Sequence, residues 1–145
     1  MELIEATAEI ANSVPRLRVV LVGTSSSGSR AYASQVRERV MARGLFGKVL
    51  ILENHGHDQI ADLLRASDVY VQPSHVEGLG LAVLEAMACG VPVVASDADG
   101  FGRSSTPAGP VCWCRWATRR RWLALFFGCC TISGCAAGWS RVVTH

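Results

Sequence analysis

The chain has 145 residues, enough for one domain with a buried core, and half of its residues are hydrophobic. Its net charge of +2 averages two unlike parts, because residues 1–103 hold nine basic and twelve acidic side chains whereas residues 104–145 hold five arginines and no acid. The overall balance therefore gives no indication of a nucleic-acid partner. The first residues are acidic and helical in pattern, unlike a signal peptide, so we expect a cytoplasmic protein, with a peripheral position on the inner face of the membrane as the alternative.

Apolar residues recur along the first hundred positions with periods that alternate between helix and strand. Residues 1–14 have the period of an amphipathic helix, and residues 17–23 form a mostly apolar run typical of a buried parallel strand. The pattern continues with helices over 30–43, 58–66 and 79–89 and strands over 48–52, 69–71 and 91–95. Strands joined by helices in this order predict an α/β fold, a Rossmann-like parallel sheet with helices on both faces.

Sheets of this kind bind ligands beyond the carboxyl ends of their strands. The loops that leave those ends are 23–29, 53–57, 73–80 and 96–102. The glycines at 23 and 28 do not form the Gly-x-Gly-x-x-Gly pattern of dinucleotide-binding proteins. His55 and His57 lack a third metal ligand nearby, so we interpret them as polar loop residues and predict no metal site.

The most informative stretch is the turn and helix over residues 73–90. Gly78 and Gly80 let a ligand approach the backbone at the start of the helix, where N–H groups without helical partners can hold a phosphate. Glu77 lies in this turn, and Glu85 lies five residues beyond Gly80, about 8 Å along the helix. A diphosphate at the turn would then place a ribose near the Glu85 carboxylate, which can accept two hydrogen bonds. The simpler alternative is a pair of solvated carboxylates.

Residues 77–96, Glu-Gly-Leu-Gly-Leu-Ala-Val-Leu-Glu-Ala-Met-Ala-Cys-Gly-Val-Pro-Val-Val-Ala-Ser, resemble the donor-binding motif of the group 1 (family 4) retaining glycosyltransferases. The resemblance implies half of a GT-B architecture, in which two Rossmann-like domains enclose the active site. It also implies a nucleotide-diphosphate sugar as donor substrate and no cofactor or metal.

The resemblance assigns roles to individual residues. Glu77, the catalytic candidate, would orient the sugar, and Glu85 would hold the ribose. The backbone of the turn would hold the diphosphate, and three further residues would border the donor. The donor-binding candidates besides Glu85 are Gly78, Leu79, Gly80, Leu81, Gly23, Asn54 and His75.

By the same resemblance, the acceptor domain and the first strand of the donor domain are not in the chain. We therefore expect residues 1–103 to form a partial nucleotide-sugar-binding domain, the donor-binding part of the enzyme, which is inactive alone. The alternatives are a non-catalytic nucleotide-binding module, a membrane-tethered fragment, a non-functional truncated gene product, and a sugar-nucleotide 2-epimerase.

Residues 104–145 differ from the rest in composition. They hold all four tryptophans and five of the six cysteines, without zinc-site spacing. The apolar run 122–139 follows three arginines, but serine, threonine and glycines dilute it, so membrane association is possible and not favoured. Shifting the reading frame by one base converts Trp and Cys codons to Leu, Met or Val codons and can restore the family pattern. We therefore interpret 104–145 as a frameshifted tail, disordered or non-native, without disulfides.

Overall fold

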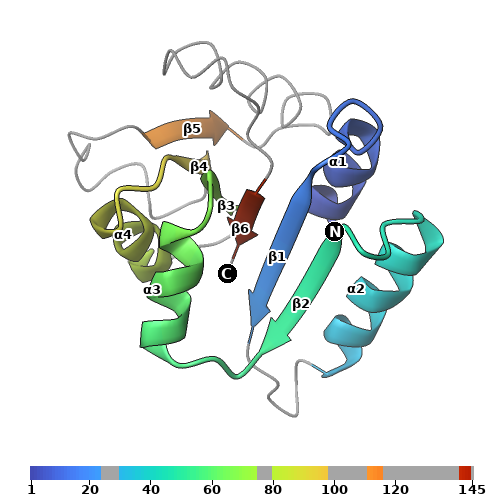
Figure 1. Ribbon diagram of the computed structural model, residues 1–145, viewed down its shortest axis with the longest axis horizontal. Helices are drawn as coiled ribbons and strands as arrows, with labels where there is room; N and C mark the ends of the chain where they lie inside the picture. Colours follow the sequence, from blue (N-terminus) through green and yellow to red (C-terminus); the bar gives the residue numbers. More distant parts are fainter. Residues whose placement is uncertain (24–29, 75–79, 98–110, 116–140, 145) are drawn as a thin grey trace.

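The computed structural model describes residues 1–23, 30–74, 80–97, 111–115 and 141–144. The six strands within these described residues form one sheet in the order β2-β1-β6-β3-β4-β5, and every neighbouring pair is parallel (Figure 1). The helices are α1 (Glu2–Ile10), α2 (Arg30–Ala42), α3 (His57–Arg65) and α4 (Leu81–Ala88). The strands are β1 (Arg18–Gly23), β2 (Val49–Glu53), β3 (Val69–Gln72), β4 (Val93–Asp97), β5 (Val111–Arg115) and β6 (Arg141–Thr144). The predicted α/β fold is confirmed.

The helices cover both faces of the sheet because β1 and its neighbours are apolar on both sides. On one face, Val19 packs in a cluster with Leu3 and Ala6 of α1. On the other face, Val22 packs in a cluster with Leu64 of α3 and with two residues of α4. Alternate residues of one strand therefore serve two different cores, as the pleat of a strand requires.

The predicted boundaries differ from the observed ones by a few residues. The first helix ends at Ile10, and a turn follows before the strand. The last predicted strand begins at Val93 because Pro92 cannot donate a ladder hydrogen bond, although its carbonyl still accepts one from the Tyr70 N–H at 2.9 Å. These differences move no strand to another place in the sheet.

The structure contradicts the expected disorder of residues 104–145 in two short segments, whereas the frameshift stays a prediction. Two parallel strands lie in this part of the chain: β5 pairs with β4 at the sheet edge, and β6 lies between β1 and β3 (Figure 1). The sequence argument considered only the cysteines, tryptophans and arginines of the segment. It gave no weight to Val111, Val142 and Val143, whose branched side chains favour strands. The other residues of the segment lie outside the described part of the chain.

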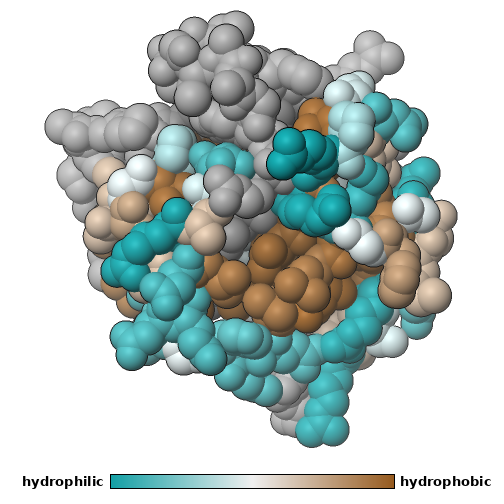
Figure 2. Space-filling view, in the orientation of Figure 1, coloured by the Kyte–Doolittle hydropathy of each residue, from teal (hydrophilic) through white to brown (hydrophobic). Residues whose placement is uncertain are grey.

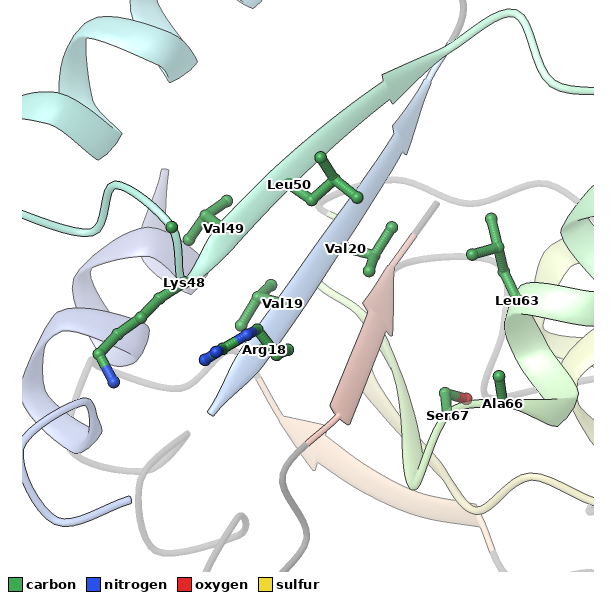
Figure 3. Close-up of a pocket in the computed structure, with 10 residues that line it drawn as sticks. Arg18, Val19, Val20, Lys48, Val49, Leu50, Leu63, Ala66 and Ser67 are labelled. Atoms are coloured by element: carbon green, nitrogen blue, oxygen red, sulfur yellow. The ribbon is translucent and has the colours of Figure 1, made fainter. Parts of the chain in front are cut away.

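Part of the sheet remains open on the face that carries α3. Leu50 on β2 is 53% exposed, and apolar surface appears around this position in Figure 2. A cavity of about 430 Å³ lies here between the amino halves of β1 and β2 and the helix α3 (Figure 3). Val20 and Leu63 face each other across it, and Arg18 and Lys48 lie at its rim. The cavity is at the opposite end of the strands from the predicted site, so it does not contribute to that site.

Candidate functional site

The carboxyl ends of the strands bring several predicted residues together. Gly23 and Glu53 end β1 and β2 and are partners in the ladder. The next residue, Asn54, donates its backbone N–H to the Gly23 carbonyl at 3.1 Å. Two loops separated by some thirty positions in the sequence therefore start side by side, whereas the donor-binding roles of Gly23 and Asn54 stay predictions.

Asn54 adopts an unusual backbone conformation, with a φ of +57°. Asparagine tolerates this left-handed region better than most residues, at a cost that is still about 1 kcal/mol. Next to it, the His55 ring nitrogen Nδ1 lies 3.0 Å from the Glu53 carbonyl, and Arg37 of α2 forms an ion pair with the Glu53 carboxylate. These contacts hold the exposed Asn54 at the end of β2 in one conformation.

The start of α4 offers backbone donors. Gly80 is the N-cap residue, with φ +59° and ψ +45°, and it supplies no side-chain cap. Its carbonyl accepts the N–H groups of Val83 and Leu84 at 3.0 and 3.2 Å. The N–H groups of Leu81 and Ala82, one step earlier, belong to the first turn, which has no helical acceptor. The partial positive charge at a helix start makes this backbone suited to an anion.

Glu85 lies farther along α4 and faces the start of α3. Its carboxylate is 3.7 Å from His57 Nδ1, and the two side chains are 43% and 92% exposed. Because the carboxylate is solvent-accessible, Glu85 can accept hydrogen bonds from a ligand. The sequence analysis considered His57 only as a possible metal ligand, and it missed the contact of His57 with Glu85. Residues of α3 and α4 pack in one cluster on the same sheet face, but the sequence does not specify which of their side chains meet.

A buried hydrogen-bond network fixes the chain just before the glycine turn. Tyr70 donates to the Gln72 side chain, whose Nε2 donates to Ser74 Oγ at 2.7 Å. Ser96 of β4 lies between the carbonyls of Gln72, at 3.2 Å, and Ser74, and its hydroxyl can donate to either. The sequence argument missed these residues, which hold the end of β3 where the turn begins.

The structure therefore joins Gly23 with Asn54 and places Gly80, Leu81 and Glu85 on one helix. The other four candidates, His75, Glu77, Gly78 and Leu79, lie outside the described residues, and their roles stay predictions. Within the part of the chain that the structure describes, no three His, Cys, Asp or Glu side chains form a cluster that could hold a metal ion. No described helix is long and apolar enough to cross a membrane.

Residues 1–108 match the family model described as glycosyl transferases group 1. The chain belongs to this family. One similar protein, the D-inositol 3-phosphate glycosyltransferase of Rhodococcus erythropolis, is 36% identical over 102 residues, which cover 69% of this chain and 23% of that protein. Another, the lipopolysaccharide core biosynthesis mannosyltransferase LpsB of Rhizobium meliloti, is 39% identical over 92 residues, covering 63% and 26%. This group 1 chain thus spans about a quarter of the length of these curated relatives.

Solved structures agree with the family assignment. Anabaena HepE in complex with UDP and glucose superposes with a TM-score of 0.78 at 25% identity, over 92% of this chain and 35% of HepE. The C-terminal domain of the group 1 glycosyl transferase LpcC from Francisella tularensis has the same fold, with a TM-score of 0.74 at 23% identity over 92% of this chain and 69% of that domain. The predicted resemblance to the C-terminal domain of a GT-B glycosyltransferase is confirmed.

Proposed function

We propose that this chain is the donor-binding half of a retaining, metal-independent glycosyltransferase that moves a sugar from a nucleotide diphosphate to an acceptor hydroxyl. One observation carries the proposal: a solvent-accessible carboxylate, Glu85, lies five residues beyond the glycine-capped start of α4. This spacing, about 8 Å, fits the separation of a diphosphate from the ribose of the same nucleotide. HepE, which is similar in fold and sequence, has been solved with UDP and with UDP-glucose.

We expect different described residues to contact different parts of the nucleotide sugar. The N–H groups of Leu81 and Ala82 would donate to the diphosphate, and Glu85 would accept from the ribose hydroxyls. Gly23 and Asn54 start the two neighbouring loops that would border the rest of the nucleotide. Negative charge develops on the diphosphate as the sugar leaves, so fixed backbone donors at the helix start would stabilise the departing group.

The role of Glu77 remains part of the proposal, supported by the family motif alone. It would lie beside the sugar and orient it for transfer. Because the acceptor side of the active site would come from another domain, we expect this chain to bind a nucleotide sugar weakly and to show no turnover by itself.

The experiment is a binding titration of the full chain by calorimetry, with UDP and GDP compared as nucleoside diphosphates of different base. Glu85→Ala should weaken binding about 10- to 100-fold, because hydrogen bonds to a charged group contribute about 1.5–3 kcal/mol. Glu38→Ala is the matched control, since it also removes an exposed helical glutamate, on α2. Metal chelation should leave binding unchanged.

Two results would contradict the proposal. One is a folded chain that binds neither nucleotide at millimolar concentration. The other is equal binding by the Glu85 and Glu38 variants, which would leave Glu85 as an ordinary surface carboxylate.

A further inference from the structure

The last strand of the chain occupies the centre of the sheet. β6 runs parallel to β1, with Arg141 opposite Arg18 and Thr144 opposite Leu21. It also runs parallel to β3, where Val142 is opposite Val69 and Val143 is opposite Tyr70. In Figure 1 the red arrow of β6 lies between the two halves of the sheet. Thr144 is 4% exposed.

The connection rules for parallel sheets give this central position to a different strand. The helices α1 and α2 share a core cluster and therefore lie on one face of the sheet. α2 leads from β1 outward to β2, and right-handed crossovers on one face proceed in one direction across a sheet. A strand that fed α1 would thus lie on the other side of β1 from β2. β6 occupies that place instead. In the chain it follows β5, which lies at the edge of the sheet opposite β2.

The two strands that flank this position, β1 and β3, contain some of the most buried described residues. Val19 of β1 is 2% exposed, and Val69 and Tyr70 of β3 are 0% and 1% exposed. With no strand between them, β1 and β3 would each present a row of unpaired N–H and C=O groups in the middle of the core. A segment binds at such a position through the hydrogen bonds of its own backbone, because any extended segment can complete both ladders at once.

We propose that the position between β1 and β3 is a strand-acceptor site for an extended, valine-rich segment that runs parallel to both neighbours. Arg141–Thr144 fills the site from within the same chain, and a segment of the same pattern supplied by a separate polypeptide fills it when β6 is weakened. This inference goes beyond the proposed donor-binding function and does not depend on it.

Recognition through the backbone explains how a tail with an unrelated composition completes a doubly wound sheet. Residues 116–140 separate β5 from β6 in the sequence, and covalent linkage within one chain can give a strand an effective concentration of about millimolar. A free peptide therefore competes poorly with intact β6. It should bind well only when the internal strand can no longer complete both ladders.

The experiment uses the full chain with Val143→Pro, which removes one backbone donor from the middle of β6. Val143→Thr is the matched control, because threonine is also β-branched and keeps the donor. Hydrogen exchange is followed by mass spectrometry in β1, β3 and β4. The added peptide covers residues 139–145, is acetylated at its N-terminus, and is supplied at millimolar concentration.

We expect Val143→Pro to raise exchange in β1 and β3 by about tenfold or more, with a smaller effect in β4, and we expect the peptide to restore protection. The threonine variant should behave as the original chain does. A peptide that itself carries Val143→Pro should not restore protection. If the proline variant unfolds as a whole, recovery of its far-ultraviolet circular dichroism on addition of the valine peptide is the same test.

Two outcomes would overturn the proposal. Unchanged exchange in Val143→Pro would mean that β6 does not hold the two halves of the sheet together. Loss of protection that the valine peptide fails to restore would mean that the position accepts only the tethered strand. Neither readout involves a nucleotide, so failure here is distinguishable from failure of the donor-binding proposal.

Discussion

The hydroxyl of Ser96 connects the end of β4 to the end of β3, directly before the glycine turn. It can donate to the carbonyl of Gln72, at 3.2 Å, or to that of Ser74, and Ser96 is only 8% exposed. Ser96→Ala keeps the Cβ and the strand but removes this donor. Because Gln72 is buried as well, at 7% exposed, solvent replaces the lost hydrogen bond poorly.

The expected loss of stability is about 1–2 kcal/mol, from a net value near 1 kcal/mol for one hydrogen bond and a further contribution for a buried carbonyl left without its donor. With a urea dependence of about 2 kcal/mol per molar for a chain of this size, the unfolding midpoint should fall by about 0.5–1 M. The slope of the transition should not change, because the fold and its buried surface remain.

Ser67→Ala is the matched control for this experiment. Its hydroxyl also donates to a backbone carbonyl, that of Leu64 at 2.6 Å, but it lies at the end of α3, beside the cavity at the other end of the sheet. Both variants are unfolded in urea and followed by circular dichroism, and both are titrated with the nucleotide that the original chain binds. Ser96→Ala should weaken binding several-fold, whereas Ser67→Ala should not. A midpoint shift below about 0.2 M for Ser96→Ala, or equal nucleotide affinity in the two variants, would refute this account of the network.

Two further predictions concern Glu5 and Gly80. Burial alone would raise the pKa of the Glu5 carboxyl, which is 12% exposed, but hydrogen bonds and charges from Arg39 and Arg43 outweigh this effect and lower the pKa below its ordinary value near 4.5. Since the folded pKa is the lower one, the ion pairs stabilise the fold above about pH 4.5, by roughly 1 kcal/mol, and this contribution disappears as the pH falls through the folded value. Urea midpoints of the original chain and Glu5→Gln should therefore differ at pH 7, and the difference should shrink as the pH is lowered below 4.5; a constant difference would contradict the assignment. Gly80→Ala and Gly44→Ala each place a Cβ at a positive φ, +59° and +66°, and each should cost about 1–2 kcal/mol of stability. Only Gly80→Ala should also reduce nucleotide affinity in calorimetry, and an equal reduction by both would argue against a site at the start of α4.

The order of helices and strands over the first hundred residues could be predicted because local pattern and global fold agree there. Val19 and Val22 must be apolar for both cores, and the periods of the helices that cover them match the same faces. The positions of Gly23, Asn54 and Gly80 followed from the topology, since loops at the carboxyl ends of parallel strands meet at one edge. The position of Glu85 followed from the helical spacing of apolar residues over 79–89. The contact of His57 with Glu85 and the bonds of Ser96 could not be predicted. Both depend on side-chain directions between elements whose spacing a sequence does not specify.

The central strand shows where local reasoning fails for a different reason. The four residues Arg141–Thr144 are too few to show the alternating pattern from which a strand is predicted. The Cys-, Trp- and Arg-rich composition of the surrounding sequence does not favour a strand either. Their place in the sheet follows from the neighbouring strands. β1 and β3 each need a parallel partner on their inner side, and the other described strands already hold the remaining positions. Residues Arg141–Thr144 pair with both strands through their backbone. The strand between β1 and β3 is thus determined by its two neighbours more than by its own sequence. For this reason Val143→Pro, which removes a backbone N–H donor, should disturb the sheet more than a polar side chain at the same position.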